Sequence, residues 1–255
     1  MGKTQSLNCF SHHAPKLDWM EQYFTFKNEF KEKNTLGSQM FSFFKRFLKD
    51  ADLLDDNGFT RFAEIISDIG LDEDLSWALM LANLAYNPQI GWYICNISFG
   101  ETMSKEYVCS MLVDSGADEK WVNDVWSSLA RILDLPFSHV GLGEMVKEKN
   151  KAVALYRTGW QVPDERVILY SLYQFSEKCG NFKQFTLTRL LDTSIESEGI
   201  SPTQIFGLNR DTMEKILNGL TFNYPDLIEA RFTLGLDNIT LKSDKSAEEI
   251  LNELF

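Results

Sequence analysis

Apolar residues recur at three- and four-residue spacing along most of this chain, and this spacing is typical of amphipathic helices. The clearest case follows Gly37, where Lys45, Arg46 and Lys49 separate the apolar positions. The apolar face there consists of Met40, Phe41, Phe44, Phe47 and Leu48. Because 44% of the 255 residues are hydrophobic and only 15 are Gly and 6 are Pro, such helices can bury a core. This composition excludes a disordered or collagen-like chain.

The pattern predicts a mainly helical chain with a few short strands. Further helices are expected from near residue 18 and at 62–69, 72–86, 104–113, 118–133, 164–179, 186–192, 211–220 and 247–254. Asp118, Asp164 and Asp211 are the expected N-caps of three of them. The stretch QIGWYICNISF (89–99) is short, apolar and rich in aromatic and β-branched residues, so it predicts a buried strand. Two hairpins are expected, at 144–159 and at 226–242, the second with its turn at 235–238.

The order helix, helix, hairpin occurs twice, and this order is typical of winged-helix modules. We therefore expect a mainly α fold with small β-hairpins, built as two winged-helix-like halves, the first with extra N-terminal helices. The expected organisation is an extended lead-in at 1–15, a helical domain with the first winged-helix-like unit at 16–160, and the second unit at 161–255.

The net charge of −12 disfavours broad electrostatic binding to nucleic acid, because phosphates repel an acidic surface. The charge is uneven: residues 1–50 contain eight Lys or Arg against five Asp or Glu, a net of +3. The sequence has neither a long apolar run nor a secretory signal pattern, so we expect no membrane insertion and a cytoplasmic protein. The four cysteines include no CxxC pair, which predicts free thiols.

No linear motif marks a catalytic site. The string GKT at 2–4 follows no glycine-rich loop or strand, so it is not a Walker A motif. The aspartates at 50–56 lack the Gly and terminal Glu of a calcium loop and predict a helix end followed by a turn. We therefore expect no catalytic residue and no cofactor, and a chain that is not an enzyme on its own.

One short motif contains residue types that can ligate zinc or help to hold an iron–sulfur cluster. Cys9, His12 and His13 form CxxHH within five positions. The motif is incomplete, because the remaining His and Cys residues lie far away in sequence. The favoured interpretation is therefore a linker that docks on another domain, with a metal site as the alternative.

The first hairpin is the best candidate for nucleic-acid contact. Its tip carries Lys147, Lys149 and Lys151 against Glu148 and could reach a phosphate. The helices before it do not support DNA binding, because 101–135 contains seven acidic and three basic residues. A charged hairpin tip is commonly a solvated edge, and that is the favoured interpretation here.

Five stretches of the chain together resemble one known family. They are SLNCFSHHAPKLDW (6–19), ANLAYNPQIGWY (82–93), LPFSHVGLG (135–143), IFGLNRDTMEKILNGL (205–220) and YPDLIEARFTLGLDNITL (224–241). They resemble the uncharacterised region found C-terminal to, or encoded beside, phosphoadenosine-phosphosulfate-reductase-like ATP pyrophosphatases in bacterial DNA phosphorothioation and phage-defence loci. Those pyrophosphatases bind ATP through an SGGxDS-type phosphate loop, which this chain lacks. The resemblance thus implies the accessory part of such a system.

The resemblance implies a non-catalytic interaction module of a DNA-modification or phage-defence complex, whose partner is the ATP pyrophosphatase of the same locus. The expected docking surface is the basic N-terminal segment together with Phe41, Phe44, Lys45 and Arg46 of the Phe-rich helix. DNA contact would be confined to the first hairpin. Two alternatives stay open: a metal-dependent DNA-nicking subunit, whose site would be assembled from residues distant in sequence, and a winged-helix DNA-binding regulator.

Overall fold

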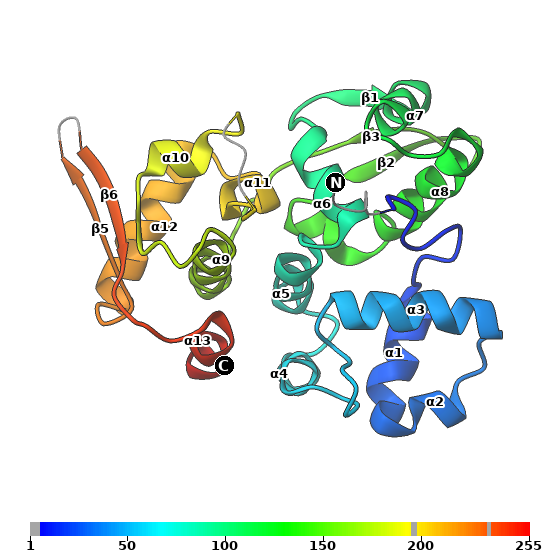
Figure 1. Ribbon diagram of the computed structural model, residues 1–255, viewed down its shortest axis with the longest axis horizontal. Helices are drawn as coiled ribbons and strands as arrows, with labels where there is room; N and C mark the ends of the chain where they lie inside the picture. Colours follow the sequence, from blue (N-terminus) through cyan, green and yellow to red (C-terminus); the bar gives the residue numbers. More distant parts are fainter. Residues whose placement is uncertain (1–5, 195–197, 234–235) are drawn as a thin grey trace. The chain divides into compact units, whose positions relative to one another are not determined.

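The computed structural model describes residues 6–194, 198–233 and 236–255, and the chain divides into two compact units. Unit 1 spans Met1–Thr158 and unit 2 spans Gly159–Phe255 (Figure 1). Within these described residues both units are mainly helical, and each contains one small antiparallel sheet of three strands. The expected fold class, mainly α with small β-hairpins, is confirmed.

In the described part of unit 1, six helices precede the first strand of a small sheet. The helices are α1 (Leu17–Phe26), α2 (Phe30–Lys33), α3 (Ser38–Asp50), α4 (Arg61–Ile69), α5 (Asp74–Leu84) and α6 (Pro88–Asn96), with a 3-10 turn at Lys27–Glu29. Then follow β1 (Thr102–Ser104), α7 (Lys105–Asp114), a 3-10 turn at Glu119–Trp121, α8 (Val122–Ile132), a 3-10 helix at Pro136–Val140, β2 (Glu144–Glu148) and β3 (Lys151–Tyr156). The central strand is β3, because Leu155 lies opposite both Met103 of β1 and Met145 of β2.

The core of unit 1 is built around α5. Every residue from Ser76 to Leu84 is buried, as the apolar character of this helix on all sides predicts. The ring of Trp77 meets Phe137 edge to face, with centroids 4.9 Å apart. On α3, Phe44 and Phe47 are fully buried and stack with centroids 6.3 Å apart. The aromatic face of α3 therefore belongs mostly to the core.

The predicted strand at 89–99 is wrong, because most of it forms α6. The Asn87 side chain accepts hydrogen bonds from the backbone N–H groups of Gln89 and Ile90, and Pro88 occupies the first turn, where a missing N–H costs nothing. The strand prediction followed the aromatic and β-branched composition. The Asn-Pro capping signal outweighs that weak preference once the helix buries Trp92, Tyr93 and Ile94.

The described part of the lead-in, 6–15, is not a linker exposed for another domain. It contains no helix or strand, but Cys9, Phe10 and Ala14 have no exposed surface. The Phe10 ring contacts Phe47 of α3 with centroids 6.0 Å apart. These residues pack in the core of unit 1, because burying Phe10 removes a large apolar surface from water. The GKT string at 2–4 lies outside the described residues.

Unit 2 repeats the layout of helices followed by a hairpin. Its elements are α9 (Glu165–Lys178), β4 (Gln184–Phe185), α10 (Leu187–Leu191), α11 (Pro202–Phe206), α12 (Arg210–Asn223), β5 (Ile228–Thr233), β6 (Leu236–Leu241) and α13 (Ala247–Leu254). Helix α9 is buried along most of its length and packs against α12 and α13. Strand β6 is central, between β4 and β5. The order of strands within the sheet is therefore the same as in unit 1.

Three sequence expectations need correction at element ends. Asp118 caps the 3-10 turn Glu119–Trp121, and α8 begins only at Val122. Asn209, and not Asp211, caps α12, because its side chain accepts the N–H of Thr212. The turn expected at 235–238 does not include 237 and 238, which are already paired in β6, and residue 235 lies outside the described chain.

In each unit a short strand precedes helices, and a hairpin with its second strand at the sheet centre follows them. We expected winged-helix-like halves from this order of elements. The winged-helix assignment itself stays a prediction. Within the described ranges, no helix has the length and apolar character needed to cross a membrane.

Candidate functional site

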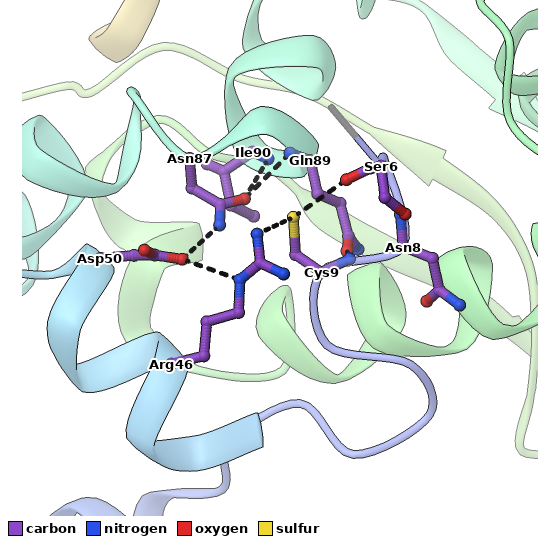
Figure 2. A network of polar contacts seen from close by, with 8 residues as sticks. All are labelled: Ser6, Asn8, Cys9, Arg46, Asp50, Asn87, Gln89 and Ile90. Atoms are coloured by element: carbon purple, nitrogen blue, oxygen red, sulfur yellow. Dashed lines mark hydrogen bonds and ion pairs between the residues drawn. The ribbon is translucent and has the colours of Figure 1, made fainter. Parts of the chain in front are cut away.

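The N-terminal segment meets α3 and the start of α6 in a polar network, drawn in Figure 2. The Arg46 guanidinium donates to the Cys9 Sγ atom at 3.2 Å and lies 3.4 Å from the Asp50 carboxylate. The Asn87 side-chain amide donates to the same Asp50 oxygen at 2.6 Å. Three segments far apart in sequence therefore converge on one cluster of charged and polar side chains.

Local sequence explains how each member of this network is positioned. Arg46 and Asp50 are four residues apart on α3, which places them on one helix face. Asn87 is held by its capping of α6, so its amide N–H group is left to face Asp50. The backbone N–H of Cys9 donates to Gln89 Oε1 at 3.0 Å, and the Gln89 amide donates in turn to Ser128 of α8. The buried Gln89 thus ties the N-terminal segment to two helices.

Cys9 is held as a neutral thiol in this network. Burial raises the pKa of the Cys9 thiol, and the nearby Arg46 cation opposes that shift only in part. A thiol with a raised pKa and no exposed surface is a poor nucleophile and a poor metal ligand. The geometry therefore makes Cys9 a packing and hydrogen-bonding residue.

A cavity of about 480 Å3 adjoins the network. Its walls include Ser6, Arg46, Asp50 and Asn87 of the network together with Asn83 and Tyr86. Because Arg46 and Asp50 form an ion pair on one wall of it, their opposite charges offset one another. This cavity offers hydrogen-bonding groups but no excess charge to hold an ion.

The predicted metal motif does not assemble around one point. The rings of His12 and His13 are tilted by 43° against each other with centroids 3.9 Å apart, and His12 Nδ1 lies 3.9 Å from Asp124 of α8. Cys9 instead contacts Arg46 and the Ser6 carbonyl. Burial, with His12 close by, lowers the pKa of His13. In the portion of the chain that the structure describes, no three His, Cys, Asp or Glu side chains are grouped to hold a metal ion.

The expected docking residues of α3 separate into three environments. Phe44 is a correction: it has no exposed surface and packs edge to face with Trp19, so it cannot contact a partner. Arg46 belongs to the polar network. Phe41 and Lys45 line a groove of about 310 Å3 between α3, the end of α1 and the turn at 55–58. Helical spacing places all four residues on α3, but the packing of α1 and α2 decides which of them stay accessible.

The three candidate lysines of the first hairpin are not equivalent. Lys147 Nζ lies 2.6 Å from the Asp134 carboxylate, so its charge is already paired. Lys149 and Lys151 are exposed at the tip, where Lys149 and Asn150 both have positive φ angles. Two such residues are typical of the tight hairpin turns that match strand twist. The tip therefore presents two cations to solvent, not three.

Three residues that organise the network were not among the residues expected to form a site, namely Asp50, Asn87 and Gln89. The Asn-Pro pair at 87–88 is a helix-start signal that could have located Asn87. Nor was an Asp74–His139 pair expected, in which His139 Nδ1 lies 2.9 Å from the carboxylate on the surface. The neighbouring Ser138 hydroxyl donates to the Leu135 carbonyl and is not directed at this pair. Ser138 is therefore not placed to act as a nucleophile beside the Asp74–His139 pair.

A scan against protein-family models, a search of curated proteins and a search of solved structures each found no match to this chain.

Proposed function

We propose that this chain is a non-catalytic, cytoplasmic interaction module of a bacterial DNA-modification or phage-defence complex, of the phosphorothioation type. Its partner is the phosphoadenosine-phosphosulfate-reductase-like ATP pyrophosphatase of the same locus. The resemblance of the five sequence stretches supplies the system and the partner. The surface of the helices that precede the hairpins supports a role in protein contact.

One observation carries this proposal: the helical segments before each hairpin expose large aromatic side chains. Trp121, in the 3-10 turn before α8, is 47% exposed, and Phe222 on α12 is 86% exposed. Aromatic side chains are enriched in protein–protein interfaces, where they bury a large area at a small entropic cost. In a winged helix, these segments are the ones that would face a partner.

Two cations of these helical segments, Lys120 and Arg210, are paired with acids of the same chain. Lys120 lies over the Trp121 ring at 5.4 Å and 3.2 Å from the Asp118 carboxylate. Arg210 at the start of α12 lies 3.3 Å from Glu214 and 3.4 Å from Asp237. A cation that is already paired contributes little to phosphate binding, because the neighbouring carboxylate repels the phosphate. This pairing favours a protein partner over DNA.

Co-purification tests the proposal. The chain is co-expressed with the ATP pyrophosphatase of its locus, and size exclusion is run with plasmid nicking assayed on the same fractions. A stable complex without nicking activity is the expected result. Nicking of supercoiled plasmid that follows the isolated chain, requires magnesium or manganese and stops with chelator would establish the nicking subunit instead.

Variants make the same experiment specific. Trp121→Ser and Phe222→Ser together should weaken the complex, whereas Val162→Ser, which changes a residue 83% exposed outside these helices, should not. Absence of a complex with the unaltered chain would overturn the proposal. Salt-sensitive binding to duplex DNA that is lost when Lys147, Lys149 and Lys151 are replaced by Glu would favour the DNA-binding regulator.

A further inference from the structure

The groove between α1 and α3 in unit 1 combines an apolar floor with a basic rim. We call it the α1–α3 groove; its floor is formed by Tyr23, Phe30, Phe41 and Leu48 and its rim by Lys27, Lys31 and Lys45. The three floor residues Tyr23, Phe30 and Leu48 are buried, while Phe41 is half-buried. The rings of Phe30 and Phe41 stack with centroids 6.1 Å apart. The floor is thus a preformed aromatic surface, not a gap between mobile side chains.

The three rim lysines outnumber the two acidic residues that line the groove, Asp55 and Asp56. Within the described residues, neither Lys27, Lys31 nor Lys45 makes an ion pair, although Lys27 Nζ lies 5.4 Å from the centre of the Phe59 ring. The neighbouring Lys33 and Lys49, in contrast, are paired with Glu29 and Asp56. In a chain with a net charge of −12, three unpaired ammonium groups around one groove form a local positive region.

The acidic residues at the groove are already engaged. Asp55 Oδ1 accepts the backbone N–H groups of Asn57 and Gly58 at 2.7 and 2.9 Å, and Asp56 pairs with Lys49. The turn is held against the 3-10 turn after α1 by Asn28, whose side chain accepts the Phe59 N–H at 2.8 Å. Gly58 has a φ of +118°, and a Cβ atom there would collide with Asn28. This wall of the groove is therefore rigid and closely packed.

We propose that the α1–α3 groove binds an acidic segment of a partner protein, which inserts one aromatic or large apolar side chain onto the floor and aligns carboxylates with Lys27, Lys31 and Lys45. This inference rests on the proposed function, because it gives the chemistry of the partner segment that an interaction module would recognise. Phe41 and Lys45 thereby keep the docking role expected from the sequence, while Lys27 and Lys31 join them.

The geometry favours carboxylates on a peptide over a phosphate. Phosphate sites commonly use backbone N–H groups together with a cation, and the turn N–H groups of Asn57 and Gly58 are taken by Asp55. The ammonium groups come from three separate elements around the rim, a distribution that suits several carboxylates along a segment. A volume of about 310 Å3 accommodates a single anchoring side chain.

Peptide binding to the full-length chain tests the inference. The probe is a fluorescein-labelled 13-residue peptide of Glu and Asp with one central Phe, followed by fluorescence anisotropy. We expect binding that weakens by about tenfold in the variant Lys27→Glu/Lys31→Glu/Lys45→Glu and by about tenfold when the central Phe of the peptide is replaced by Ser. These lysines are exposed, and a thermal melt checks that the variant is folded.

The matched control is Lys147→Glu/Lys149→Glu/Lys151→Glu, which makes the same change of charge elsewhere in unit 1. Its affinity for the peptide should stay within about twofold of that of the unaltered chain. If both variants lost the same affinity for the peptide, net charge alone would explain the effect and the inference would be overturned. Equal binding of the Ser peptide, or no binding up to about 1 mM peptide, would overturn it as well.

The co-purification experiment separates this inference from the proposed function. If the groove variant forms the complex with the ATP pyrophosphatase as well as the unaltered chain does, the proposed function stands and the groove inference is wrong. If the unaltered chain forms no complex, the proposed function is wrong, and the peptide assay alone decides whether the groove binds acidic segments.

Discussion

Replacing Asn87 should destabilise unit 1 through two separable contacts. In Asn87→Ala, α6 loses its N-cap, which costs about 1 kcal/mol, and Asp50 loses the 2.6 Å hydrogen bond from the Asn87 amide. A hydrogen bond to a charged group contributes roughly 1.5 to 3 kcal/mol, and Asp50 is partly exposed, so we take the lower value. The free energy of unfolding should therefore fall by about 2.5 kcal/mol.

Two further substitutions at this position separate the contacts. In Asn87→Ser, the hydroxyl still caps α6 but is too short to reach Asp50, so the expected loss is about 1.5 kcal/mol. In Asn87→Asp, the cap also survives, but a second carboxylate faces Asp50. The loss in free energy of unfolding caused by Asn87→Asp should become smaller as the pH is lowered, because protonating one of two adjacent carboxylates removes their repulsion and restores a hydrogen bond.

The assay is urea unfolding followed by tryptophan fluorescence. Five of the six tryptophans lie in unit 1, so the signal reports mainly on the unit that contains Asn87. The matched control is Asn96→Ala on the same helix. Its exposed side chain donates to the Trp92 carbonyl, and its loss should cost no more than about 0.5 kcal/mol. If Asn87→Ser were as stable as the unaltered chain, the Asp50 contact would contribute nothing and the reasoning would be refuted.

Three other predictions concern unit 1. Arg157 is fully buried and donates to carbonyl groups at the end of α6. Arg157→Met should therefore lower the free energy of unfolding by about 3 kcal/mol and the melting temperature by roughly 10 °C. An unchanged melting temperature would contradict this. Because the pKa of His13 is lowered in the folded state, the unfolded state takes up the proton first. Stability should fall as the pH drops below about 6.5, and His13→Asn should flatten this part of the urea-unfolding profile. Cys95 is exposed and Cys9 is not, so Ellman's reagent should modify Cys95 in the native protein and Cys9 only after unfolding; early loss of Cys9 would contradict its burial.

Local sequence determined the elements whose signals lie within a few residues of one another. The apolar spacing of α3, the cap of α9 at Asp164 and the bounds of α13 all follow from side chains one or two turns apart. The hairpin of β2 and β3 follows from its short tip, which contains Lys and Asn residues. The error at α6 has the same origin, because composition over a short apolar stretch does not separate strand from helix.

The tertiary structure decided which side chains meet. Cys9 and Arg46 are both candidate site residues in the sequence. Their spacing along the chain does not predict that the Arg46 guanidinium lies 3.2 Å from the Cys9 Sγ atom. Phe41 and Phe44 share one helical face, and only the packing of α1 and α2 leaves Phe41 in a groove while Phe44 is buried. The geometry of helices and strands repeats every few residues, so these elements can be predicted from the sequence. Contacts between elements depend on how whole helices pack, and that packing minimises exposed apolar area over the entire unit.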